Sequence, residues 1–271
     1  MTPVADPATW LSLAGRVALV TGGGHGIGRG IAQVLAAAGA TVVVSDLDAA
    51  RAAAVAAEIG GVAMMLDVSD RVAANCAVES TVAQCGALDI LVNNAGIFDG
   101  FGTSIVDLPD ATWDRVRAVN MDGVFHASRA AARAMLAAGR PGRIVNISST
   151  QAFTPGAGIA YDAAKAAVAQ MTKSLALDLG RHGITVNAVV PGPIWNRDGP
   201  PPDTITLSSQ RDDGDPDNPM LASVRSHMAR LPLARWGVPE DVGKAVLFLV
   251  SDMSPMVTGA LLAVDGGWLT L

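Results

Sequence analysis

Strand-like and helix-like segments alternate along most of this chain, and the alternation limits its fold more than any other feature. The strand-like segments are short, continuous apolar runs rich in β-branched residues. Such runs are typical of strands that are covered by helices on both faces, whereas a strand with one wet face alternates apolar and polar residues. We therefore predict an α/β fold built on a doubly wound parallel sheet.

Seven strands and six helices are expected, and the length of 271 residues suits a single domain over residues 1–271. The expected strands are Arg16–Thr21, Thr41–Ser45, Val62–Leu66, Leu88–Asn93, Arg143–Ser148, Ile184–Val190 and Ala260–Val264. The expected helices are Gly26–Ala38, a helix capped by Asp48 that runs through Ile59, Ser69 to about Cys85, about Asp110–Ala138, Gly158–Leu179 and Pro239–Val250.

The alternation is broken by a long segment from Pro191 to about Pro219, which is rich in proline and aspartate. Its aspartates resemble the start of a calcium loop, but Asn218 and Val224 stand where that loop needs glycine and glutamate, so we expect no metal there. Long loops in compact domains are often lids. We expect residues 195–230, which include an amphipathic segment at Met220–Arg230, to close over a mostly apolar substrate. Its candidate inward-facing and titratable residues are Trp195, Met220, Leu221, Met228 and His227.

Composition narrows the partners of the chain. The formal charge is −6 and no basic run is interleaved with aromatic residues, which argues against nucleic acid. Cys76 and Cys85 have no metal-ligand spacing, and no basic leader or bilayer-length apolar run is present, so a cytoplasmic protein without membrane contact is expected. Half of the residues are hydrophobic and the mean hydropathy is +0.36, which favours buried subunit interfaces.

A glycine-rich turn joins the first strand to the first helix, with the sequence TGGGHGIG over residues 21–28. Glycines allow a tight turn and a close approach to a pyrophosphate, whose charge is met by the helix N-terminus. Because a strand precedes the turn and a helix follows it, we predict a dinucleotide site.

Asp46 ends the second strand about 20 residues further on, where an acid can accept hydrogen bonds from the adenosine ribose. Asp48 is the better helix cap, which leaves Asp46 for the ribose. Leu47, which follows, offers no positive charge to a 2′-phosphate, so NAD is favoured over NADP. His25 is the one feature against the preference for NAD, since a basic residue there could contact a phosphate.

Tyr161, the only tyrosine of the chain, precedes Lys165 by four residues in an expected helix, so the two side chains share one face. A unit charge at about 4 Å is worth roughly 1 kcal/mol in water and roughly 4 kcal/mol at an effective dielectric of about 20. Lys165 can therefore lower the pKa of the phenol to neutrality only where water is excluded. The pair is a candidate for proton transfer.

With the glycine turn and this pair together, the chain resembles the short-chain dehydrogenases/reductases of the single-domain type over about residues 13–268. Further motifs carry the resemblance: Asn93-Asn94-Ala95-Gly96, Asp67-Val68, Val119-Asn120, Ser148 thirteen residues before Tyr161, Pro191-Gly192-Pro193-Ile194 and Val264-Asp265-Gly266-Gly267-Trp268. The resemblance departs at Asn196, where the family commonly has a threonine shortly after Pro-Gly. Asn196 could replace it as a donor to the cofactor.

The resemblance implies a Rossmann-type fold and hydride transfer between NAD and a small or medium secondary alcohol or its ketone. Tyr161 would move the proton, and Lys165 would depress its pKa and bind the nicotinamide ribose. Ser148 would hydrogen-bond the substrate oxygen, and Asn120 would hold a water that joins Lys165 to solvent. The implied cofactor contacts are Gly22, His25, Gly26, Ile27, Gly28, Asp46, Leu47, Asp67, Val68, Asn93, Ala95, Gly96, Tyr161, Lys165, Pro191, Gly192 and Ile194.

The family also implies a homotetramer, formed through alanine-rich faces at Ala118–Ala138 and Ala160–Ala176. The tail at residues 268–271 would close a second interface or pack on its own core.

Two other functions are alternatives to the NAD-dependent dehydrogenase. A 3-oxoacyl-thioester reductase normally uses NADPH and a basic face, against which Asp46 and the net charge count. A non-catalytic NAD-sensing regulator would be suggested by loss of Tyr161 or Lys165, and both are present.

Overall fold

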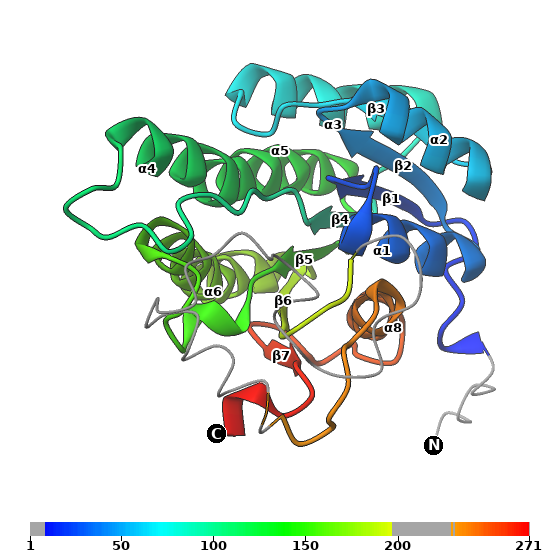
Figure 1. The fold of residues 1–271 in the computed structure, drawn as a ribbon. Helices are drawn as coiled ribbons and strands as arrows, with labels where there is room; N and C mark the ends of the chain where they lie inside the picture. The colour runs from blue at the N-terminus through cyan, green and yellow to red at the C-terminus, as the bar shows by residue number, and fades with distance from the viewer. Residues whose placement is uncertain (1–8, 197–228, 230, 271) are drawn as a thin grey trace.

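The computed structural model describes residues 9–196, 229 and 231–270, which form a seven-stranded sheet with all strands parallel (Figure 1). Its strand order is β3-β2-β1-β4-β5-β6-β7. The strands are β1 (Val17–Thr21), β2 (Thr41–Asp46), β3 (Val62–Met65), β4 (Ile90–Asn93), β5 (Arg143–Ile147), β6 (Thr185–Pro191) and β7 (Leu261–Val264). Each predicted strand is found with its ends within two residues, so the predicted Rossmann-type sheet is confirmed.

Helices cover both faces of the sheet, as the apolar strands require (Figure 1). One face carries α1 (Gly26–Ala37), α2 (Ala49–Ile59) and α8 (Pro239–Val250), and the other carries α3 (Arg71–Cys85), α5 (Gly123–Ala138) and α6 (Ile159–Leu179). Two hydrophobic cores result, one on each face. Ile31 of α1 and Val246 of α8 belong to the first, and Val78 of α3 and Met135 of α5 belong to the second.

The direction of strand succession reverses between β1 and β4, which are neighbours in the sheet. The chain leaves β1 toward β2 on one side and leaves β4 toward β5 on the other. In such sheets a crevice opens at the carboxyl ends of the strands at this point, and ligands bind there. The glycine turn, Asp46 and the loops after β4, β5 and β6 all lie at this edge.

The helix predicted for residues 110–138 is instead three consecutive segments. α4 (Asp110–Arg117) leads into a π-helical turn at Ala118–Asp122, and α5 follows. The wider turn buries Asn120, whose side chain accepts a hydrogen bond from Ile97 N and donates one to Ile97 O, both at 2.8 Å. Such turns are frequent at functional sites, and the helical pattern of the sequence does not reveal them.

Several expectations fall on residues outside the described ranges: the aspartate-rich run, the Met220–Arg230 segment and His227. Within the described ranges, no helix is both long and apolar enough to cross a bilayer. The same ranges contain no cluster of three or more His, Cys, Asp or Glu side chains suited to a metal ion.

Candidate active site

A cavity of about 710 Å³ lies at the carboxyl edge of the sheet and is lined by the loops that follow β1 to β6 and by α6. It brings together residues that lie far apart in the sequence. The predicted residues that line it are Gly22, His25, Gly26, Ile27, Gly28, Asp46, Leu47, Asp67, Val68, Ala95, Gly96, Ser148, Tyr161, Lys165, Pro191, Gly192 and Ile194. Asn93 and Asn120 are not among its lining residues.

The glycine turn is closed so tightly that side chains do not fit. A Cβ atom on Gly28 would lie 2.0 Å from Gly22 O, and one on Gly22, where φ is +62°, would lie 2.8 Å from Ala95 Cα. Asn94 fixes the turn by donating from Nδ2 to Thr21 O and Gly22 O, at 3.0 and 2.9 Å. His25, the N-cap of α1, makes no side-chain hydrogen bond to the first helical turn. The turn therefore fits the phosphates of a dinucleotide, which would meet the helix N-terminus.

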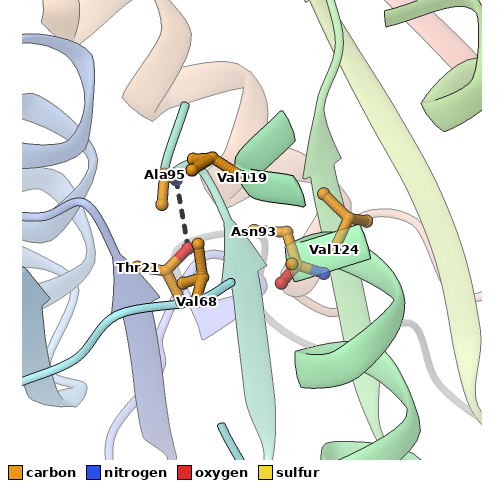
Figure 2. Close-up of a pocket in the computed structure, with 7 residues that line it drawn as sticks. Thr21, Val68, Asn93, Ala95, Val119 and Val124 are labelled. Carbon is orange, nitrogen blue, oxygen red and sulfur yellow. Dashed lines mark hydrogen bonds between the residues drawn. The ribbon is translucent and has the colours of Figure 1, made fainter. Parts of the chain in front are cut away.

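Beneath the turn, Thr21 ties β1 to the loop after β4 (Figure 2). Its hydroxyl accepts hydrogen bonds from Asn94 N at 3.0 Å and Ala95 N at 3.1 Å. The adjacent hollow has no room for a water molecule, and Asn93 lines it. The Asn93 amide donates to Ser128 Oγ and Asn146 Oδ1, both at 2.8 Å. The side chain of Asn93 therefore lies in the core, and Asn94 lines the large cavity, so a cofactor contact of Asn93 stays a prediction.

Asp46 is buried at the end of β2 and also holds the turn. Its Oδ2 accepts from Gly24 N and its Oδ1 from Asp48 N, both at 3.0 Å, and His25 Nδ1 lies 3.8 Å from Oδ2. Asp48 caps α2 by accepting from Ala50 N and Arg51 N, as predicted. A carboxylate oxygen can accept more than one hydrogen bond, so Asp46 keeps capacity for a ribose hydroxyl in the cavity.

Tyr161 and Lys165 both extend from α6 into the cavity. Lys165 Nζ lies over the Tyr161 ring, 5.6 Å from its centroid, and donates to Ile147 O at 2.8 Å. Burial lowers the pKa of Lys165 to about 8. Burial raises the pKa of Tyr161 to about 12; a hydrogen bond with Ser149 acts in the opposite direction, and the Asp162 carboxylate adds to the rise.

Burial dominates the shift in the Tyr161 pKa, and a depression of that pKa by Lys165 stays a prediction. The ammonium faces the aromatic ring and a backbone carbonyl, so removal of the phenol from water outweighs its attraction. Burial disfavours the charged form of both side chains. Both are removed from water, which is the condition that the sequence argument sets for the pair.

Lys165 is expected to make stability depend on pH. Its pKa in the folded chain is about 8, against 10.5 for an ordinary lysine, so the unfolded chain binds more protons between these pH values. The free energy of unfolding should therefore rise with pH across this window, by about 3 kcal/mol from this group. Urea denaturation without added nucleotide should show the rise in the wild type and not in Lys165→Met. Lys173→Met, which changes an exposed lysine of the same helix, is the control; the same rise in Lys165→Met would contradict the assignment.

The structure brings Ser149, rather than Ser148, to the phenol. Ser148 is buried and donates from Oγ to Lys165 O at 2.9 Å, whereas the side chain of Ser149 hydrogen-bonds Tyr161. Ser149 is in an extended conformation, and adjacent residues of extended chain point to opposite sides. The two hydroxyls thus point to different sides, and the Ser149 hydroxyl is the one near the phenol.

Asn120 lies near Lys165 and outside the cavity lining. A Cβ atom on Gly96 would lie 3.4 Å from Asn120 Oδ1 and 3.6 Å from Lys165 Nζ, so the asparagine lies near the lysine. Its side chain is bonded to both polar groups of Ile97. A water held by Asn120 stays a prediction.

Aromatic residues, of which the sequence motifs include only Trp268, extend the wall beyond Tyr161. Phe98 packs edge-on against Tyr161 with ring centroids 5.0 Å apart, and Phe101 lies 5.4 Å from Phe98. Trp268 Nε1 donates to Thr154 Oγ1 at 3.2 Å and packs with Trp236. Trp268 and Leu269 of the tail therefore pack on their own chain, and a second interface closed by the tail stays a prediction. Asn196 lines the cavity beside Gly26, and the remainder of the expected lid, apart from its described ends, lies outside the described ranges.

Comparison with known proteins agrees with this geometry. A family model described as Enoyl-(Acyl carrier protein) reductase matches residues 22–269. The chain is 41% identical over 264 residues to 2-(S)-hydroxypropyl-CoM dehydrogenase 3 of Xanthobacter autotrophicus, covering 94% of this chain and 97% of that protein.

Two solved structures are similar over nearly their whole length. A short-chain type dehydrogenase/reductase from Mycobacterium marinum has a TM-score of 0.81 at 30% identity, covering 97% of this chain and 99% of that one. A candidate 2-deoxy-d-gluconate 3-dehydrogenase from Agrobacterium tumefaciens, with NADP bound, has a TM-score of 0.81 at 38% identity and the same coverage. The sheet, the glycine turn, the Tyr161–Lys165 pair and these matches agree: the chain belongs to the short-chain dehydrogenase/reductase family, whose fold binds a nicotinamide dinucleotide.

Proposed function

We propose that this protein is an NAD-dependent oxidoreductase that interconverts a small or medium secondary alcohol and its ketone. One observation carries the proposal: Ser149, Tyr161 and Lys165 meet in the same cavity as the glycine turn and Asp46. The cofactor, when bound, supplies the hydride acceptor or donor. Every other step falls to groups of the chain.

Tyr161 transfers the proton, taking it from the alcohol in oxidation and returning it to the ketone oxygen in reduction. Ser149, already hydrogen-bonded to Tyr161, binds the substrate oxygen and keeps it within reach of the phenol. We assign this role to Ser149, and we assign to Ser148 the positioning of α6 through Lys165 O. Lys165, sheltered behind the ring, passes protons toward Asn120 and binds the nicotinamide ribose.

The described lining of the cavity supports an uncharged substrate. Its only basic side chains are His25, at the phosphate turn, and Lys165, at the phenol. Small ketones should therefore be better substrates than carboxylates or phosphates. Reduction of a panel of ketones and 3-oxoacyl thioesters with NADH tests the proposal. Activity confined to the thioesters would favour the 3-oxoacyl reductase, and cofactor binding without turnover of any substrate would favour the sensor.

Asp46 is proposed to select NAD, although the Agrobacterium relative was solved with NADP. Asp46→Asn should raise kcat/KM with NADPH about tenfold relative to NADH, because the charge that repels a 2′-phosphate is lost while an acceptor for the turn stays. Asp46→Ala should in addition weaken NAD binding, since Gly24 N and Asp48 N lose their acceptors. Steady-state kinetics with both cofactors measures this, and a wild-type preference for NADPH would refute the assignment.

A homotetramer in the cytoplasm is the proposed state of the enzyme. The outer surfaces of α5 and α6 expose Phe125, Leu136 and Leu177, the last with 87% of its surface accessible. Both cysteines are free thiols, as suits a reducing compartment. Light scattering at micromolar concentration should give a mass of about 110 kDa for four chains of 27.6 kDa. A mass of one chain would contradict the proposal.

A further inference from the structure

Gln151 lines the cavity, and its side-chain amide has no use in the steps above. Its Oε1 is inaccessible to solvent and has no hydrogen-bond partner among the described residues. Its backbone N donates to Ser149 Oγ at 3.2 Å, in the short 3-10 turn that follows β5. The unpartnered amide oxygen thus belongs to a residue whose backbone N–H is hydrogen-bonded to Ser149, the serine beside Tyr161.

A buried amide without a partner is unfavourable unless a ligand satisfies it. Phe98, Phe101 and Ala157, which line the same cavity, have apolar side chains and offer the amide no partner. A hydroxyl group is the ligand atom best suited to Gln151, because it both donates and accepts. It therefore satisfies the amide whichever way oxygen and nitrogen are oriented.

The position of Gln151 fixes which hydroxyl this is. Gln151 N is bonded to Ser149 Oγ and Gln151 lines the same cavity, so a reacting oxygen held by Ser149 and Tyr161 would have its neighbouring carbon on the side of the 3-10 turn in the pose that we infer. We propose that Gln151 is a specificity-determining residue that hydrogen-bonds a hydroxyl on the carbon next to the reacting carbon. The preferred substrates are then vicinal diols and the matching α-hydroxy ketones. This inference rests on the proposed oxidoreductase function and names its substrate class.

The reaction stays balanced with such a substrate. In reduction, the carbonyl carbon gains the hydride lost by the reduced cofactor, and the carbonyl oxygen gains the proton of Tyr161. The neighbouring hydroxyl keeps all its bonds and serves only for binding. A site that hydrogen-bonds a substrate hydroxyl discriminates strongly against an analogue without it, because its own polar group is then left unpaired.

The test compares 1-hydroxy-2-butanone with 3-pentanone, in which a methyl group replaces the hydroxyl. Wild-type kcat/KM should be at least about 100-fold higher for the hydroxy ketone. Gln151→Leu should lower kcat/KM for the hydroxy ketone by about 30-fold or more and leave that for 3-pentanone unchanged or higher. Gln84→Leu, which changes an exposed glutamine on α3, is the matched control and should alter neither. If Gln151→Leu does not fold, Gln151→Met keeps the side-chain length and carries the same expectation.

The outcomes separate the two proposals. If the wild type reduces both ketones equally, or if Gln151→Leu lowers both in the same proportion, Gln151 does not read the hydroxyl and this inference fails while the oxidoreductase function stands. If the folded wild type binds NAD but reduces neither these ketones nor any other of the panel, the proposed function fails and the inference with it.

Discussion

Replacement of Tyr161 by phenylalanine should abolish turnover and leave nucleotide binding nearly intact. Only the hydroxyl is lost, while the ring keeps its packing against Phe98 and beneath Lys165. Loss of a group that transfers the proton costs about 100- to 10,000-fold in rate, and we expect at least about 1,000-fold here. Steady-state assays would give kcat, and fluorescence titration with NADH would give the dissociation constant, which should change less than about threefold.

Ser149→Ala supplies a graded comparison for this result. It removes the group that hydrogen-bonds Tyr161 and leaves the proton donor in place, so its loss should be smaller than that of Tyr161→Phe. Ser148→Ala, whose hydroxyl bonds the backbone of Lys165, should change kcat least of the three. A Tyr161→Phe variant that kept more than a few per cent of wild-type activity would show that another group moves the proton.

Replacement of Gly28 by alanine should remove dinucleotide binding. The added methyl group would lie 2.0 Å from Gly22 O and 2.5 Å from Asn94 Nδ2. Because the nearest atom is backbone, α1 must move away from the turn that it closes. We expect the NAD dissociation constant to rise at least about 100-fold and the free energy of unfolding to fall by about 1–3 kcal/mol.

Gly180→Ala is the matched control for this substitution. Gly180 has φ of −58°, and a Cβ atom there would meet nothing within 4 Å. Alanine at this position should be neutral or slightly stabilising, by up to about 1 kcal/mol, since it restricts the unfolded chain. Calorimetric titration would give the NAD dissociation constant of each variant, and urea denaturation would give its free energy of unfolding. Losses in Gly28→Ala without losses in Gly180→Ala would show that the effect belongs to the phosphate turn and not to alanine in general. Unchanged NAD affinity in Gly28→Ala would exclude the turn as the phosphate site.

The sheet and the position of the site could be predicted because they follow from patterns that are local in the sequence. Runs such as Val17–Thr21 and Thr41–Asp46 have both faces covered by helices, so each strand is apolar throughout. Parallel strands must end at the same edge, which places the glycine turn, Asp46 and the Tyr161 helix together.

The details that escaped prediction depend on side-chain direction. The spacing in the sequence favours Ser148, and only the geometry at the end of β5 shows that the Ser149 hydroxyl is the one near Tyr161. Asn93 and Asn94 differ in the same way, one facing the core and the other the cavity. The sequence predicts that Lys165 lowers the pKa of the phenol, whereas burial is the largest cause of the pKa shifts of both groups. The unpartnered oxygen of Gln151 becomes visible only once the cavity exists.

Isotope transfer tests the central claim most directly. NADH carrying deuterium at the transferable position would be incubated with 1-hydroxy-2-butanone and the wild-type enzyme, and the alcohol analysed by mass spectrometry. The account predicts one deuterium bound to the carbinol carbon of the product, with none formed by Tyr161→Phe. Alcohol product without deuterium, or label transfer that persists in Tyr161→Phe, would contradict it.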